Sequence, residues 1–72
     1  MINNYESDYA VVCVNSFAKR KGLNYKEAYL YLYNHKGLDF LKEFYDIEHT
    51  LSIDDAIHDL TAICRNNGGE IT

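Results

Sequence analysis

The segment from Tyr45 to Ser52 holds the densest group of polar side chains that could take part in chemistry. Asp46 lies three residues before His49, and Tyr45 lies four residues before it. A histidine with a carboxylate partner can act as a general base, and a nearby Tyr or Thr can take part in proton transfer. The interpretation that we favour is structural: His49 and Thr50 hydrogen-bond exposed backbone groups at a packed helix–helix corner. A binding role for His49 is a second interpretation, and catalysis is a third.

A catalytic or metal-binding function has little other support in the sequence. The chain has 72 residues, which leaves little room for a pocket that excludes water. A structural zinc site needs four ligands in closely spaced pairs, and the sequence has no such pattern. The plausible soft or borderline ligands are His35, His49, His58 and Cys64. We expect His58 to be partly exposed and to pair with Asp54 or Asp55, and we expect no enzyme activity, cofactor or metal.

A run of tyrosines gives the clearest indication of a binding surface. Tyr is common at interfaces, because its ring can be buried while its hydroxyl stays in water. The alternative is that these rings only fill a small core. The candidate interaction residues, in this run and in the corner segment, are Tyr25, Tyr29, Tyr31, Tyr33, Tyr45, Asp46, His49 and Thr50.

Charge is distributed unevenly and disfavours nucleic acid as the main partner. Residues 1–36 carry five Lys and Arg against three Asp and Glu, a net charge of +2, whereas residues 37–72 carry two against eight, a net charge of −6. An acidic half repels phosphates and attracts basic protein surfaces. Two helices joined at residues 34–37 would resemble a helix-turn-helix, but the second one, residues 38–46, has three acids and one Lys. A small DNA-associated regulator is therefore the alternative function.

Apolar periodicity predicts four helices, the third of them short. They cover about residues 7–21, 24–36, 38–47 and 52–67, and Gly22, Gly37 and Gly68 separate or end them. The expected caps are Ser7, Asn24 in a capping box with Glu27, and Ser52. Lys19, Arg20 and Lys21 lie in a last turn, where cations suit the helix dipole. Residues 10–14 alone could instead form a short buried strand.

The helical pattern also predicts which residues form the core. The predicted faces are Ala10, Cys13, Val14 and Phe17; Tyr25, Ala28, Tyr29 and Leu32; two rows of Leu38, Leu41 and Tyr45 and of Phe40, Phe44 and Ile47; and Ile53, Ala56, Ile57, Leu60, Ile63 and Cys64. We expect an all-α domain, a compact bundle over residues 1–72 with its core at about 8–67 and fraying at 1–6 and 69–72. So apolar a chain of this size also predicts a homodimer or a protein-docking face.

The compartment follows from what the sequence lacks. Cys13 and Cys64 lie within apolar patterns, there is no CxxC pair, and we expect two reduced core thiols. The N-terminus lacks the order of a signal peptide, and no apolar run approaches the ~20 residues of a membrane span. These features predict a cytoplasmic protein that does not enter the membrane.

The order of these segments resembles a family of small bacterial proteins classed as a domain of unknown function. The shared features are an apolar first helix with a Cys, a helix rich in Tyr and Leu, a segment like residues 38–41, the Tyr-Asp-x-x-His-Thr corner at 45–50, and a last helix like residues 52–57. The resemblance covers about residues 8–69. It implies a cytoplasmic helical module, often encoded near ADP-ribosyltransferase-like toxins, and carries over no catalytic residue. We therefore expect a non-enzymatic protein-interaction module, antitoxin-like or accessory to a toxin.

Overall fold

The computed structural model describes residues 4–69 of the chain, and side chains from residue 8 onward. Within this range the fold is entirely helical, as expected. The helices are α1 (Asn4–Lys21), α2 (Tyr25–Asn34), α3 (Gly37–Glu43), α4 (Tyr45–Glu48) and α5 (Ile53–Asn66). The prediction of four helices is corrected to five in the described residues, because the expected third helix is divided at Phe44. The alternative strand at residues 10–14 is wrong, since these residues lie inside α1.

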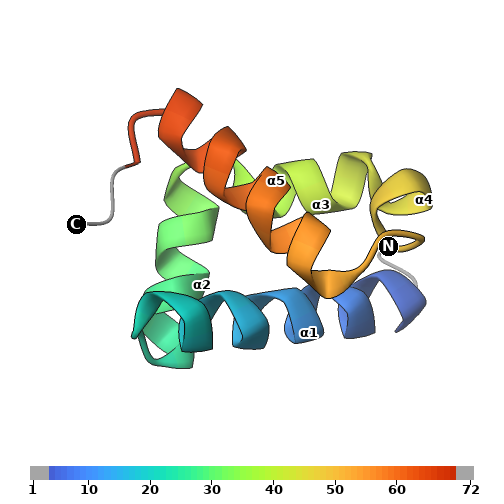
Figure 1. Ribbon diagram of the computed structural model, residues 1–72, viewed down its shortest axis with the longest axis horizontal. Helices are drawn as coiled ribbons and strands as arrows, with labels where there is room; N and C mark the ends of the chain where they lie inside the picture. The colour runs from blue at the N-terminus through green and yellow to red at the C-terminus, as the bar shows by residue number, and fades with distance from the viewer. Residues whose placement is uncertain (1–3, 70–72) are drawn as a thin grey trace.

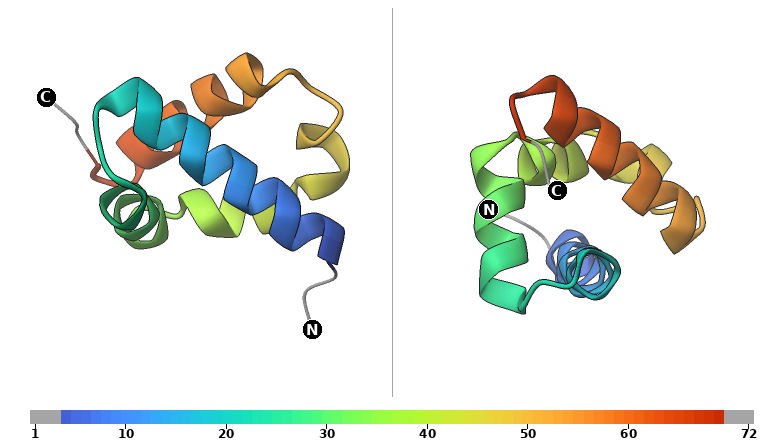
Figure 2. Two further views of the ribbon diagram at one scale, coloured as in Figure 1. Left: turned by 90° about the horizontal axis from the view of Figure 1, so that it is seen from below. Right: turned by 60° about the vertical axis from the view of Figure 1, so that its left-hand side comes forward.

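The helices surround a single apolar core. Figure 1 shows α1 along one side, α2 rising from its end, and α5 crossing over the core toward α1. When the molecule is turned, α1 is seen nearly end-on with α2 and α5 on different sides of it (Figure 2). The residues buried in the core are Cys13, Val14, Phe17, Ala18, Ala28, Leu32, Leu41, Ala56, Ile57, Leu60 and Cys64. The predicted stripes of α1 and α5 are thus the ones that supply most of the core.

Two of the three expected helix caps are confirmed. The Asn24 side chain accepts a hydrogen bond from the Glu27 backbone N–H at 2.8 Å, and the Glu27 side chain accepts one from the Asn24 N–H at 3.0 Å. Ser52 caps α5 by accepting from the Asp55 N–H. Ser7 does not cap α1, because that helix begins at Asn4. The fraying expected at 1–6 and 69–72 lies outside the described residues at positions 1–3 and 70–72.

Gly37 has a different role from the one that we expected. It begins α3 and is buried, while the left-handed residue after α2 is Lys36, with φ of 71°. A Cβ on Gly37 would lie 2.7 Å from Cδ2 of Leu32 and 3.2 Å from Sγ of Cys64. Glycine is therefore needed here for the close approach of α3 to the core and not for its dihedral freedom.

The break between α3 and α4 changes which apolar residues reach the core. Phe44 has φ of −108° and ψ of 24°, which interrupts the helical path. Leu41 before the break is buried, whereas Phe44 and Ile47 are exposed. The predicted row of Phe40, Phe44 and Ile47 is therefore not a buried face, because a single helical periodicity does not continue through residue 44.

The described helices also bear on membrane insertion. Over the part of the chain that the structure describes, none of them is both long and apolar enough to cross a bilayer. A groove with a largely apolar lining lies between α1, α2 and α3.

Candidate functional site

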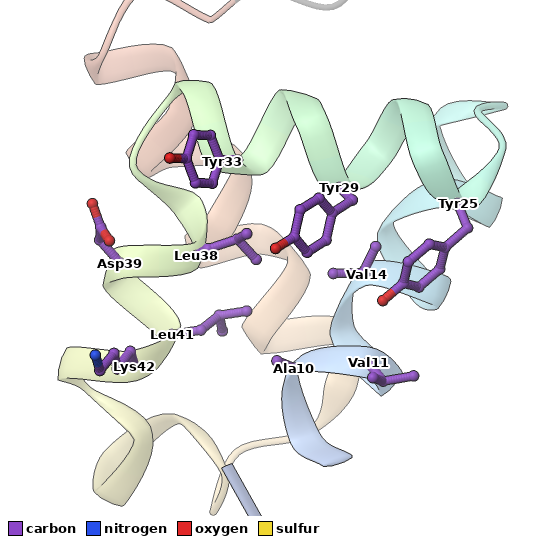
Figure 3. Close-up of a pocket in the computed structure, with 10 residues that line it drawn as sticks. All are labelled: Ala10, Val11, Val14, Tyr25, Tyr29, Tyr33, Leu38, Asp39, Leu41 and Lys42. Atoms are coloured by element: carbon purple, nitrogen blue, oxygen red, sulfur yellow. The ribbon is translucent and has the colours of Figure 1, made fainter. Parts of the chain in front are cut away.

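An apolar groove of about 460 Å³, which we call the tyrosine groove, lies between α1, α2 and α3. Figure 3 shows three tyrosines of α2 along one wall, with residues of α1 and α3 forming the others. Its lining residues are Ala10, Val11, Val14, Tyr25, Tyr29, Tyr33, Leu38, Asp39, Leu41 and Lys42. Most of these side chains are apolar or aromatic, so the groove suits a ligand that buries apolar surface.

Helical spacing places Tyr25, Tyr29 and Tyr33 in one row. Residues four apart lie above one another on a helix, and the rings stack in nearly parallel planes. The ring centroids are 6.3 Å apart for Tyr25 and Tyr29 and 6.5 Å apart for Tyr29 and Tyr33. All three side chains are exposed, and Tyr33 is the most exposed, at 64%. The row is thus ordered by contacts within α2 while its outer surface stays open.

The face of α2 that packs into the core differs from the predicted one. Ala28 and Leu32 are buried, but Tyr25 and Tyr29 turn toward the groove. Tyr31 was predicted as an interaction residue but does not line the groove. It is half-buried and stacks on Phe17 with ring centroids 5.6 Å apart. Three of the four predicted tyrosines on α2 therefore share one surface, and the fourth supports the core.

The other walls of the groove give it both apolar contact and charge. Val11 on α1 is 43% exposed, and Leu41 on α3 forms part of the buried floor. Asp39 and Lys42, both exposed on α3, add one negative and one positive side chain at the edge. Sequence periodicity did not indicate Val11, Asp39 or Lys42 as site residues, because the groove forms only where three helices meet.

The remaining predicted site residues, Tyr45, Asp46, His49 and Thr50, lie at α4, separate from the groove lining. His49 Nδ1 lies 2.6 Å from the Tyr45 carbonyl oxygen, and Thr50 Oγ1 donates to the Ile47 carbonyl at 2.6 Å. Both interactions agree with the structural interpretation of the corner. His49 is exposed, however, and stacks on the Tyr45 ring at 4.4 Å, so its predicted packed position is wrong.

The buried polar residue of this corner is Glu48, which no pattern in the sequence indicated. Only 5% of Glu48 is exposed, and its Oε1 has no hydrogen-bond partner among the described residues. Tyr9 on α1 stacks edge-on against Tyr45 and donates from Oη to the Glu48 carbonyl oxygen at 2.9 Å. A lone Glu in a helical segment carries no sequence signal of burial, which explains the omission.

Burial and neighbouring acidic groups make the Glu48 side chain retain its proton. Together, burial, a hydrogen-bonding interaction with the Asp59 carboxyl and repulsion from Asp59 and Asp55 raise the pKa of Glu48 from 4.5 to about 7. We call Tyr9, Cys13, Glu48 and Asp59 the Glu48 corner. Burial also raises the pKa of Tyr9 and of the Cys13 thiol.

The two cysteines are free and buried, as predicted. Burial raises the pKa of Cys64 to about 11, which keeps this thiol protonated and unreactive near neutral pH. Cys13 lies within reach of the Tyr9 hydroxyl, whereas Cys64 packs beside Gly37. Each thiol therefore belongs to a different part of the core.

The described residues contain no group of three or more His, Cys, Asp and Glu side chains that could hold a metal ion. The sequence suggested that His58 pairs with Asp54 or Asp55. In the structure, Asp54 instead forms an ion pair with Arg20 of α1. His58 is exposed, in agreement with its predicted position.

The arrangement defines an all-helical domain with an open aromatic groove and, apart from the groove, a buried Glu48 carboxyl beside Asp59. Residues 8–67 match the family described as protein of unknown function (DUF3791), and the chain belongs to that family. No curated protein and no solved structure gives a significant match to the chain. Any function must therefore be argued from the groove and the corner themselves.

Proposed function

We propose that this protein is a non-enzymatic interaction module whose tyrosine groove binds an apolar segment of a partner protein. The observation that carries the proposal is the open row of Tyr25, Tyr29 and Tyr33 above an apolar floor. Aromatic rings already ordered by stacking lose little conformational entropy on binding, and exposed tyrosines are typical interface anchors.

Charge beside the groove favours a partner segment with a basic flank. Asp39 lies at the groove, and Glu43 and Asp46 are exposed farther along α3 and α4. Lys42 is the one cation among residues 37–46, so the acids outnumber it in this segment. An apolar anchor in the groove, followed by Lys or Arg residues over α3, would match both features.

The proposed partner of the tyrosine groove is a toxin-type protein. A toxin-type protein, to which this chain would act as an antitoxin or accessory subunit in a bacterial cytoplasm, fits a small acidic binding module. A second copy of the chain is the other candidate occupant, and a homodimer would cover the same apolar surface. Light scattering over a concentration series separates the two, because only self-association makes the solution mass rise with concentration.

The alternative DNA-associated function has weaker support. Its recognition helix would be α3, which has only seven residues and places Gly37 and Leu41 in the core. Two of its exposed side chains, Asp39 and Glu43, would repel phosphates. Lys19, Arg20 and Lys21 lie at the end of α1, where Lys21 also sits over the Phe17 ring, 5.7 Å from its centroid.

Two adjacent valines offer a matched test of the groove. Val11 lines the groove at 43% exposure, whereas Val12 is 47% exposed and is not part of the lining. A photo-crosslinking amino acid at position 29 would be combined with Val11→Asp or with Val12→Asp in the expressing cell. We expect one crosslinked protein, identified by mass spectrometry, to be lost with Val11→Asp and retained with Val12→Asp.

The crosslinking result can distinguish a partner protein from a second copy of the chain, and it can also contradict binding in the groove. A crosslinked product made only of this chain, together with a rising solution mass, would assign the groove to a homodimer. Equal crosslinking in both valine variants would contradict binding in the groove. DNA binding at low salt that is lost when Lys19, Arg20 and Lys21 are neutralised would support the alternative function.

A further inference from the structure

The Glu48 corner combines features that are unfavourable for a charged group. Glu48 is 5% exposed, and the charged groups acting on it from α5 are the carboxyls of Asp59 and Asp55. From α1 it faces the Tyr9 hydroxyl and the Cys13 thiol, which are neutral groups at neutral pH. No cation is among these described groups, so an ionised Glu48 would be buried without a compensating charge.

A shared proton resolves this conflict. Two carboxyls that contact each other are stable together when one keeps its proton, which then forms the hydrogen bond between them. The Glu48 Oε1 is buried without a hydrogen-bond partner among the described residues, and burial, interaction with Asp59 and repulsion from Asp55 together raise the pKa of Glu48 to about 7. The proton that joins α4 to α5 is therefore held at mildly acidic pH and released as the solution becomes alkaline.

The element that carries Glu48 is the one most easily detached. Helix α4 has four residues and is followed by the irregular segment 49–52. It is held to α1 by the Tyr9–Glu48 hydrogen bond and the contact between the Tyr9 and Tyr45 rings. Short elements with few buried apolar contacts open locally at lower free-energy cost than the whole domain.

We propose that Glu48 and Asp59 form a pH-dependent switch, in which loss of their shared proton releases α4 from α1 and α5 and exposes the Glu48 corner. The switch is independent of the groove, whose lining includes no residue of α4 or α5. Its consequence is a local opening beside Cys13, while the core around Cys64 stays closed.

The two cysteines allow this opening to be measured with an internal control. The native protein would be alkylated with iodoacetamide between pH 6 and pH 8.5, and peptide mass spectrometry would give the modification rates of Cys13 and Cys64 separately. We expect the ratio of the Cys13 rate to the Cys64 rate to rise at least about tenfold across this range, since each unit of pKa difference corresponds to tenfold.

Variants identify the group responsible. In Glu48→Gln the ratio should stay nearly constant, because no proton can be lost, while the exposed Glu43→Gln variant should behave like the original protein. Removing the Glu48 charge also lowers the pKa of Cys13, which acts in the opposite direction and cannot mimic the expected result. A constant ratio in the original protein, or the same rise in Glu48→Gln, overturns the proposal.

If circular dichroism shows that Glu48→Gln does not fold, a second variant can test the proposal. Asp59→Asn removes the repulsion and the second titrating carboxyl, so the rise in the ratio should be smaller than in the original protein. A rise of the same size in Asp59→Asn overturns the proposal, because the opening would then not depend on the carboxyl pair.

Discussion

Tyrosines occur in both the tyrosine groove and the Glu48 corner, but the two regions use them differently. In the groove, Tyr29 stacks on both Tyr25 and Tyr33, and all three residues are exposed. In the corner, the Tyr9 hydroxyl donates a hydrogen bond to the Glu48 carbonyl oxygen, and the Tyr9 ring packs against Tyr45. An aromatic side chain thus prepares a binding surface in one region and joins two helices in the other. Substitutions should accordingly affect binding in the groove and stability in the corner.

The largest expected change in stability distinguishes a substitution on the buried face of α2 from one on its exposed face. Leu32→Ala removes a fully buried side chain and leaves a cavity, so we expect a loss of about 4 kcal/mol in the free energy of unfolding. Tyr33→Ala removes an exposed side chain, and we expect a change within about 0.5 kcal/mol. Thermal denaturation would check this, because a loss of that size lowers the midpoint by more than about 10 °C in a domain of this size. Similar midpoints for the two variants would contradict the assignment of the two faces.

The next effect depends on pH and concerns only the corner. Because folding raises the pKa of Glu48 from 4.5 to about 7, the folded state binds this proton more tightly than the unfolded chain. The resulting stability is fully present below pH 4.5 and is lost as the pH rises through about 7. The loss amounts to at most about 3.5 kcal/mol, since one pKa unit equals about 1.4 kcal/mol.

Glu48→Gln should abolish most of this pH dependence, and urea denaturation between pH 4 and pH 8.5 measures it. Glu43→Gln, an exposed carboxyl on α3, is the matched control and should leave the profile unchanged. If both variants retained the original pH profile, the burial of Glu48 would not be what sets it.

One chemical change made in both regions sharpens the comparison further. Tyr9→Phe deletes the hydroxyl that donates to Glu48, which we expect to cost about 1 kcal/mol. Tyr29→Phe deletes the hydroxyl of an exposed residue in the groove and should leave the free energy of unfolding nearly unchanged. Denaturant titration of the two variants tests this, and a larger loss in Tyr29→Phe would reverse the distinction between the regions.

The smallest effect concerns the two exposed histidines. His49→Ala loses the interaction with the Tyr45 carbonyl and the stacking on the Tyr45 ring, so we expect a loss of about 0.5 kcal/mol. His58→Ala should change stability less, because the His58 side chain is exposed on α5. Thermal melts that place His58→Ala lower would show that the corner histidine is not structural.

Local patterns in the sequence determined much of the helical framework. Asn24 with Glu27 and Ser52 before two acids correctly marked the starts of α2 and α5, because capping depends on groups within one turn. The buried stripe of α5 could likewise be predicted from its periodicity. The division at Phe44 could not, because the pattern of apolar residues continues across it while the backbone turns.

What only the tertiary structure decided is which side of an element faces a neighbour. The sequence identified Tyr25, Tyr29 and Tyr33 as interface candidates, but the groove needed walls from α1 and α3, and their positions depend on long-range packing. The burial of Glu48 was missed and the role of Gly37 was misassigned for the same reason, since neither burial beside Asp59 nor a close approach to Leu32 is encoded in neighbouring residues. Helices and caps follow from local interactions, whereas grooves and buried carboxyl groups depend on contacts between residues far apart in the chain.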